Sequence, residues 1–189
     1  MFTILAFAIM NLVVFGILVV IFVRGYHRCP PGKVLVIYGK MGRTVREGPK
    51  CITKGVAFVW PFIQSYCYLD LTASEVAVNL RDALTKENDR VDVSATFTVG
   101  ISTKPGVLQN AAERILGLDE HHIASLAKEI IQGQIRLICA SRDSNEVRGD
   151  EAFVSEVNEN VERELNKIGL TLINAVLNIH VVPKRVNLS

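Results

Sequence analysis

The first 23 residues form one continuous apolar segment. Only Thr3, Asn11 and Gly16 interrupt it, and the first charged side chain is that of Arg24. A helix of this length spans roughly 35 Å at about 1.5 Å per residue, against a hydrocarbon core of about 30 Å. Because lipid offers the backbone no hydrogen bonds, the pattern predicts an N-terminal transmembrane helix, with residues 1–28 as the anchor.

Two other interpretations of this segment stay open. A re-entrant hairpin would place its turn near Asn11 or Gly16. A processed signal peptide needs a basic start and small residues at its cleavage site, but no basic residue precedes the segment and residues 22–26 are a poor cleavage site.

The charges around the segment are one-sided. Basic side chains follow it and none precedes it: Arg24, His27, Arg28, Lys33, Lys40, Arg43 and Arg46. The positive-inside rule therefore predicts a single-pass protein with its C-terminal domain in the cytoplasm. The membrane is expected to be the plasma membrane. Tyr26 stands where an interfacial aromatic side chain is expected. The basic residues act either as stop-transfer charges or as ligands for anionic lipid headgroups.

Short apolar segments separated by Gly and Pro follow the anchor. Residues 34–38 and 66–71 predict buried strands. Residues 55–62 are the most apolar segment after the anchor and predict a short strand ending in a turn. Its large aromatic side chains belong either to the core or to the lipid headgroup region, where Trp is favoured. These are Phe58, Trp60 and Phe62.

Strict alternation of apolar and polar residues marks the next two segments, 76–80 and 91–101. A polar turn at 85–89 lies between them, so together they predict an antiparallel hairpin with one wet face. A third alternating segment runs from Ile173 to Val181 and ends at Pro183.

Helical periodicity replaces the alternation between these strands. Pro105 opens a short helix that ends near Leu116, and Asp119 is a candidate N-cap for the next helix. That second helix is expected to bury a stripe with i, i+3, i+4 spacing. The stripe consists of Ile123, Leu126, Ala127, Ile130, Gln134, Leu137 and Ile138.

A third helix is predicted from residue 151 to Ile168, with Gly169 as its C′ residue. One face is apolar and consists of Phe153, Val157, Val161, Leu165 and Ile168. The opposite face is acidic and consists of Glu151, Glu156, Glu159, Glu162 and Glu164. This acidic face is either solvated or a contact between protomers, for which Glu156, Glu159 and Glu162 are the candidates.

The order of elements predicts an α/β chain of the α+β kind. Its first half is rich in strands, mainly antiparallel, and its second half holds helices and a closing strand. We expect a domain at 29–182 made of two packed subdomains with a boundary near 80–105, followed by a tail at 183–189.

Composition excludes several kinds of function. With 21 Lys and Arg against 19 Asp and Glu, and no basic run interleaved with aromatics, no nucleic-acid partner is expected. Four cysteines, Cys29, Cys51, Cys67 and Cys139, form no C-x-x-C pair and are expected to be reduced thiols. Cys29, next to the anchor, is either a site of acylation or an ordinary small residue.

No catalytic, cofactor-binding or metal-binding motif stands out. The densest titratable cluster runs from Asp119 to His122, but adjacent histidines on a helix point about 100° apart and do not form a metal-binding pair. The sequence has no P-loop, G-x-S-x-G or G-x-G-x-x-G motif. We therefore expect a protein that is not an enzyme and uses no cofactor.

Several spaced motifs resemble those of the flotillins. They are Pro-Pro-Gly-Lys-Val-Leu-Val-Ile at 30–37, Gly-x-x-Phe-Val-x-Pro-x-Ile-Gln at 55–64, Ala-Ala-Glu-Arg-Ile-Leu-Gly at 111–117, Ile-Gln-Gly-Gln-Ile-Arg-Leu-Ile at 131–138 and Lys-Ile-Gly-Leu at 167–170. Their order identifies the chain as a flotillin-like member of the SPFH (stomatin, prohibitin, flotillin; band 7) superfamily. One departure is His122, where the family usually has a glutamate three residues after the helix cap.

This resemblance implies a membrane-anchored scaffold without enzymatic activity, which oligomerises in its full-length context and organises membrane microdomains. Its implied partners are membrane lipids, further copies of itself and other membrane proteins. An alternative within the same superfamily is a regulator of a membrane protease or channel, as stomatin and prohibitin relatives are. Family members continue into a long assembly helix, which these 189 residues do not include.

Overall fold

The computed structural model describes residues 2–39, 48–60, 62–147 and 151–181. The chain divides into two compact units, unit 1 (Met1–Asp70) and unit 2 (Leu71–Ser189). The expected boundary near 80–105 is wrong, because strands β6 (Ser74–Leu84) and β7 (Arg90–Ile101) pair with each other inside unit 2. The expected tail at 183–189 and the strand end at Pro183 lie outside the described residues.

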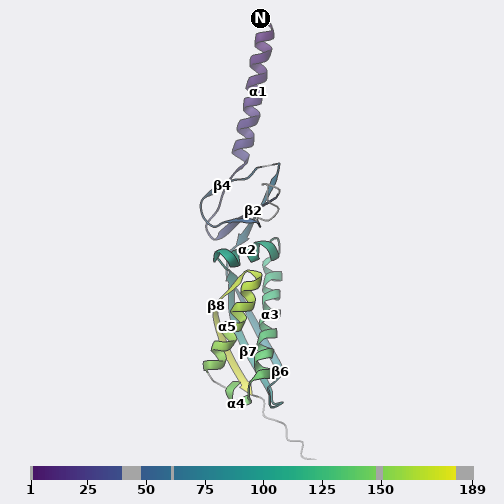
Figure 1. Ribbon diagram of the computed structural model, residues 1–189, viewed down its shortest axis with the longest axis vertical. Coiled ribbons are helices and arrows are strands. Elements are labelled where there is room, and N and C mark those ends of the chain that lie inside the picture. The colour runs from purple at the N-terminus through teal and green to yellow at the C-terminus, as the bar shows by residue number, and fades with distance from the viewer. Residues whose placement is uncertain (1, 40–47, 61, 148–150, 182–189) are drawn as a thin grey trace, which may run out of the picture. The chain divides into compact units, whose positions relative to one another are not determined.

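Unit 1 begins with helix α1 (Phe2–Arg24), the helix expected at the N-terminus (Figure 1). It is continuous through Asn11 and Gly16, so the hairpin interpretation is wrong. Asn11 Nδ2 donates to the carbonyl oxygen of Phe7 at 3.1 Å, which satisfies this polar group along the helix. In the part of the chain that the structure describes, no helix is both long and apolar enough to cross a membrane. The predicted membrane-spanning anchor is therefore not supported.

The described part of unit 1 also contains five strands. Strand β2 (Lys33–Gly39) lies between β3 (Lys50–Ile52) and β5 (Gln64–Asp70), antiparallel to both. Strands β1 (Tyr26–Arg28) and β4 (Val56–Phe58) form a separate antiparallel pair. The strands predicted at 34–38 and 66–71 are confirmed as β2 and β5. Leu35, Ile37 and Val59 form the core, against which Ile52, Ala57 and Tyr68 pack.

Unit 2 is a three-stranded antiparallel sheet in the order β6-β7-β8, where β8 is Leu170–Val181. Helices α3 (Glu120–Ser141) and α5 (Glu151–Ile168) pack against β6 and β8, respectively, and against each other. Helices α2 (Pro105–Arg114) and α4 (Ser144–Val147) complete the unit. Figure 1 shows α3 and α5 running along the strands. The predicted hairpin, helices and closing strand, and hence the α+β class, are confirmed.

The core of unit 2 forms where the helices meet the sheet. Phe97 on β7 and Phe153 on α5 are its largest fully buried side chains. Alternation along β7 is confirmed, since Val91, Val93 and Val99 are also buried. On β8 the alternation is interrupted: Thr98 pairs with Asn174 but Val99 pairs with Leu172, so Ile173 is an extra residue and is 58% exposed.

The stripe predicted for α3 is displaced around the helix. Its buried residues are Ala127, Ile131, Ile135, Ile138 and Cys139. Leu137, expected inside, is 65% exposed. Apolar residues occupy more than half of the circumference of α3, so periodicity alone did not decide which arc packs against the sheet.

Two helix ends follow the predicted chemistry. The Asp119 carboxylate accepts from the backbone N–H of His122 at 2.9 Å, so Asp119 is the N-cap of α3. This hydrogen bond, with the side-chain contact to His122, lowers the pKa of Asp119. Gly169 ends α5 with φ of +93°, a conformation that glycine adopts without strain.

Candidate functional site

The junction between α1 and the strands of unit 1 gathers most of the residues expected at a membrane interface. The backbone N–H of Val59 donates to the carbonyl of Gly25 at 2.7 Å, which holds β4 against the end of the helix. A Cβ atom on Gly25 would lie 2.5 Å from the Phe58 ring and 2.9 Å from the Val59 carbonyl oxygen. Glycine therefore permits this close approach, which sequence reasoning did not foresee.

An aromatic cluster continues from the last turns of α1 into β4. The ring centroids of Phe22 and Phe58 are 5.4 Å apart, and those of Phe58 and Trp60 are 5.9 Å apart in an edge-on arrangement. Tyr26 is the register partner of Phe58 in the β1–β4 pair and is 60% exposed. Sequence-distant aromatic side chains thus form one surface at the end of the apolar helix.

The segment at 55–62 divides between core and surface. Val59 is 2% exposed and belongs to the core, whereas Trp60 is 44% and Phe62 79% exposed. The structure therefore places the large aromatic side chains outward, which leaves them available to lipid or to another surface.

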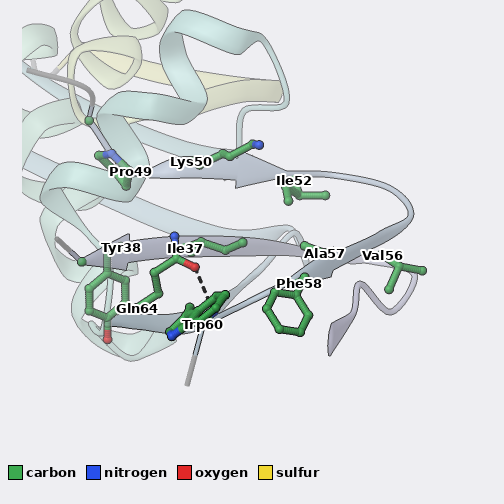
Figure 2. A pocket seen from close by; sticks show the side chains of 12 residues that line it. Ile37, Tyr38, Pro49, Lys50, Ile52, Val56, Ala57, Phe58, Trp60 and Gln64 are labelled. Carbon is green, nitrogen blue, oxygen red and sulfur yellow. Dashed lines mark hydrogen bonds between the residues drawn. The ribbon is translucent and has the colours of Figure 1, made fainter. Parts of the chain in front are cut away.

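A groove of about 700 Å³ opens beside these aromatic residues. Figure 2 shows Tyr38, Phe58 and Trp60 on its walls, with Ile37 and Ile52 among the lining residues. The side-chain oxygen of Gln64 accepts from the backbone N–H of Trp60 at 3.0 Å, which fixes the turn after β4. Sequence analysis did not identify Tyr38 or Gln64, because they join the groove only through strand pairing.

A second aromatic group lies on β1 and β5. The rings of His27 and Tyr66 have centroids 3.9 Å apart, and Tyr66 contacts Tyr68 edge-on at 5.8 Å. The Tyr68 hydroxyl donates to the carbonyl of Arg28 at 3.3 Å. These contacts hold β1, with its basic residues, onto the sheet of unit 1.

Charge is distributed unevenly along the chain. Residues 1–70 contain eight Lys and Arg against two Asp and Glu, a net charge of +6, whereas residues 71–189 contain 13 against 17, a net charge of −4. Arg24 lies in the last turn of α1 and Arg28 ends β1. Lys40, Arg43 and Arg46 lie outside the described residues. Unit 1 therefore combines exposed aromatic side chains with an excess of positive charge.

Cys29 lies next to this surface but its thiol is directed into the fold. Its Sγ is 3.1 Å from the carbonyl oxygen of Lys33 and 3.4 Å from that of Ile52, and it packs against the unit 1 core. Acylation of Cys29 stays a prediction, and it would require the thiol to turn outward.

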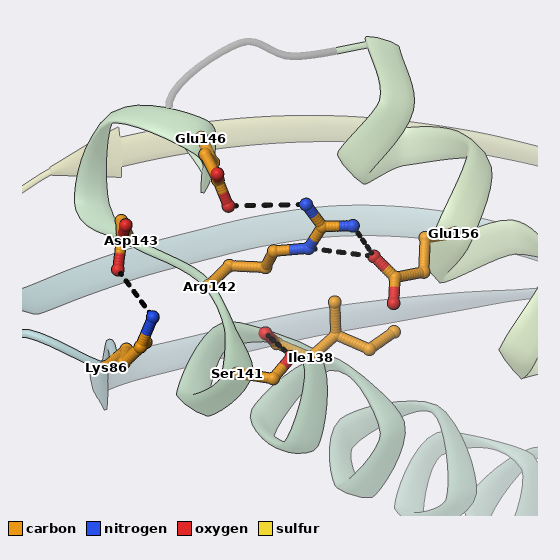
Figure 3. Close-up of polar contacts among 7 residues, drawn as sticks. All are labelled: Lys86, Ile138, Ser141, Arg142, Asp143, Glu146 and Glu156. Atoms are coloured by element: carbon orange, nitrogen blue, oxygen red, sulfur yellow. Dashed lines mark hydrogen bonds and ion pairs between the residues drawn. The ribbon is translucent and has the colours of Figure 1, made fainter.

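The glutamates expected at a protomer contact have basic partners within unit 2. Glu156 accepts from Nε and Nη2 of Arg142 at 3.1 and 2.7 Å, while Nη1 of Arg142 donates to Glu146 (Figure 3). These hydrogen bonds raise the pKa of Arg142. Glu159 pairs with Arg163, and Glu162 with Lys104. A protomer contact through these residues stays a prediction.

The polar cluster at the start of α3 borders a shallow hollow. Ser74 Oγ donates to Glu120 Oε1 at 2.8 Å there, and Asp119 is held by His122 as described above. Among the residues that the structure describes, no three His, Cys, Asp or Glu side chains are grouped so as to hold a metal ion.

Comparison with known proteins agrees with the sequence motifs. The family model for the SPFH domain / Band 7 family matches residues 27–186. This chain belongs to the SPFH domain / Band 7 family. Its sequence is 27% identical over 165 residues to flotillin-like protein FloT of Bacillus subtilis, covering 83% of this chain and 32% of the relative.

Other flotillins give the same result. Flotillin-like protein 2 of Medicago truncatula is 33% identical over 155 residues, covering 79% of this chain and 30% of the relative. Human flotillin-1 is 25% identical over 154 residues, covering 80% of this chain and 35% of the relative. The chain is therefore a flotillin-like SPFH member that spans about a third of the length of these relatives.

Proposed function

We propose that this chain is a flotillin-type membrane scaffold without enzymatic activity, which attaches to the cytoplasmic face of the cell membrane through unit 1 and self-associates there to organise membrane microdomains. The observation that carries the proposal is the continuity of the apolar helix α1 with the exposed aromatic cluster of β4. Membership of the SPFH family and the likeness to flotillins support it.

The first part of the argument concerns α1. Nearly all of its described large apolar side chains are exposed, and they lie around the whole helix. They are Phe7, Ile9, Met10, Leu12, Val13, Val14, Phe15, Ile17, Leu18, Val19, Val20, Phe22 and Val23. A helix that is apolar on every side requires an apolar environment, and lipid provides one.

The second part concerns the surface at the end of α1. Phe58 contacts Phe22, so a lipid-embedded α1 would hold Phe58 and Trp60 at headgroup depth, where aromatic rings are favoured. The net charge of +6 on residues 1–70 suits an anionic leaflet, at about 1 kcal/mol for each Lys or Arg near the surface. In this proposal α1, the aromatic side chains and the basic residues of unit 1 all bind the same bilayer.

Trp60 provides the test, because it is the only tryptophan in the sequence. The full chain is reconstituted into vesicles of phosphatidylcholine and phosphatidylserine, and Trp60 emission is measured with lipids that carry a quencher at different depths. We expect stronger quenching by shallow quenchers than by deep ones, and protection from aqueous iodide.

A matched control moves the tryptophan to unit 2. Leu118 is 43% exposed, nearly the same as Trp60 at 44%. The double variant Trp60→Phe, Leu118→Trp should be quenched by iodide and not by the lipid probes. If Trp60 in the wild-type chain behaves like this control, unit 1 does not contact the bilayer through β4 and the proposal fails.

A further inference from the structure

Helix α3 carries a second apolar arc on the side that does not pack against the sheet. Leu137 is 65% exposed, Gly133 and Ala140 are exposed, and Leu126 and Ile130 are half-buried. These five residues are spaced by four, three, four and three positions, which is the repeat of a helix that pairs with another helix. The arc is therefore suited to a helical partner.

Among the residues that the structure describes, no neighbour requires glycine at position 133, the centre of this arc. A Cβ atom there would meet no described atom within 4 Å beyond its chain neighbours and the backbone of its own helix. Glycine in the middle of a helix lowers helix stability relative to alanine. Its advantage is that it lets a second backbone approach closely, with Leu137 one turn away to pack beside the contact.

Two charged residues on the border of the arc indicate which helix the partner is. Glu129 and Arg136 are both exposed and lie seven residues apart, two turns along the same side of α3. Within the described part of the chain, neither side chain has an ion pair. If two α3 helices cross antiparallel at Gly133, Glu129 of each copy faces Arg136 of the other. In a parallel two-fold pair this side of each helix lies on the opposite flank of the contact, so neither residue has an opposite charge facing it.

We propose that two copies of this chain associate through α3, antiparallel and crossing at Gly133. Ile130 then packs against Leu137 of the other copy, and Leu126 against Ala140. The contact is isologous, because each residue pair occurs twice about a two-fold axis. This inference rests on the proposed self-association and assigns a surface to it. A single helix pair is smaller than the roughly 800 Å² per partner of a stable interface, so concentration on a membrane favours it.

Disulfide crosslinking tests the geometry in the full chain on vesicles, with Cys29, Cys51 and Cys67 replaced by Ser. Gly133→Cys places both thiols at the crossing, within the Cα separation of about 7 Å that a disulfide requires. In Leu137→Cys the two thiols lie about 12 Å apart along the helix axis, eight residues at about 1.5 Å each. Lys128→Cys, on another exposed side of α3, gives the random background.

We expect a dimer yield for Gly133→Cys about tenfold above that of Lys128→Cys, and no enrichment for Leu137→Cys, following the same distance limit. In the Gly133→Cys background, Glu129→Lys and Arg136→Glu should each reduce the yield to background. The combined exchange restores opposite charges and should restore the yield. A structural defect in either single variant would not be repaired in this way.

The particle mass of the wild-type chain after gentle extraction separates two failures. A multimeric particle with no enrichment for Gly133→Cys, or with no rescue by the charge exchange, overturns the α3 contact and leaves the scaffold in place. Strong crosslinking of Leu137→Cys to itself overturns the antiparallel arrangement. A monomer under all conditions overturns both the α3 contact and the proposed self-association.

Discussion

Gly169 holds the junction of α5 and β8 against α2, so its replacement by alanine tests how unit 2 is packed. An added Cβ atom would lie 2.2 Å from the backbone nitrogen of Ala111 and 2.3 Å from its Cα and Cβ atoms. Non-bonded carbon atoms prefer separations of about 3.5–4.0 Å, so α2 would have to move by more than about 1 Å. Such overpacking costs about 1–3 kcal/mol.

A second contribution comes from the backbone of Gly169, whose φ is +93°. An L-residue with a left-handed backbone costs about 1–2 kcal/mol. Alanine also reduces the entropy of the unfolded chain, which offsets about 0.4–1 kcal/mol. We therefore expect Gly169→Ala to lower the free energy of unfolding by about 1–5 kcal/mol, a large part of the 5–15 kcal/mol typical of a domain.

Gly117 separates the steric from the backbone contribution. Its φ is +84°, close to that of Gly169, but a Cβ atom there would meet nothing within 4 Å. Gly117→Ala should therefore show the backbone cost alone. Urea unfolding of both variants in mild detergent, followed by circular dichroism, gives the difference. If Gly169→Ala is no more destabilising than Gly117→Ala, then α2 does not pack against the end of α5 as described.

Two further predictions concern titratable groups. The folded pKa of Asp119 is lowered, so its contribution to stability is present above the ordinary carboxyl pKa and is lost as the pH falls through the folded value. Asp119→Ala should lower the urea midpoint at neutral pH, Asp119→Asn should not, and the difference between wild type and Asp119→Ala should begin to shrink only below about pH 4, as the pH falls through the lowered folded pKa; a difference that does not change with pH in this range would contradict a contribution from the charge of the carboxylate. Burial raises the pKa of Cys139 to about 11, so at pH near 8 iodoacetamide should label Cys29, Cys51 and Cys67 well before Cys139. Mass spectrometry reports each site, and equal labelling of Cys139 would show that α3 is not packed against the sheet.

Local patterns predicted most elements of the fold. Alternation predicted β6 and β7, Asp119 predicted the start of α3, and Gly169 predicted the end of α5. These features depend on a residue and its immediate neighbours in the chain, through strand periodicity, capping and glycine stereochemistry. Such short-range effects are present in the sequence itself.

The candidate site was predicted only in part. Trp60 and Phe62 stood out because large aromatics in a short apolar segment are unusual, and both are exposed. Tyr38 and Gln64 did not, since they reach the groove through the pairing of β2 with β5. The ion pair of Glu156 with Arg142 was also missed. Arg142 follows α3 directly and Glu156 lies in α5, 14 residues later, so only the packing of the two helices brings them together.

By itself, the sequence determined the apolar N-terminal helix, the excess of positive charge in its first 70 residues and the SPFH motifs. Only the tertiary structure decided which arc of α3 is buried, which strand carries the extra residue Ile173, and which side chains line the groove. The physical reason is that periodicity describes how side chains are arranged around one element. Which side of that element is covered depends on the shape and position of its neighbours, which come from distant parts of the chain.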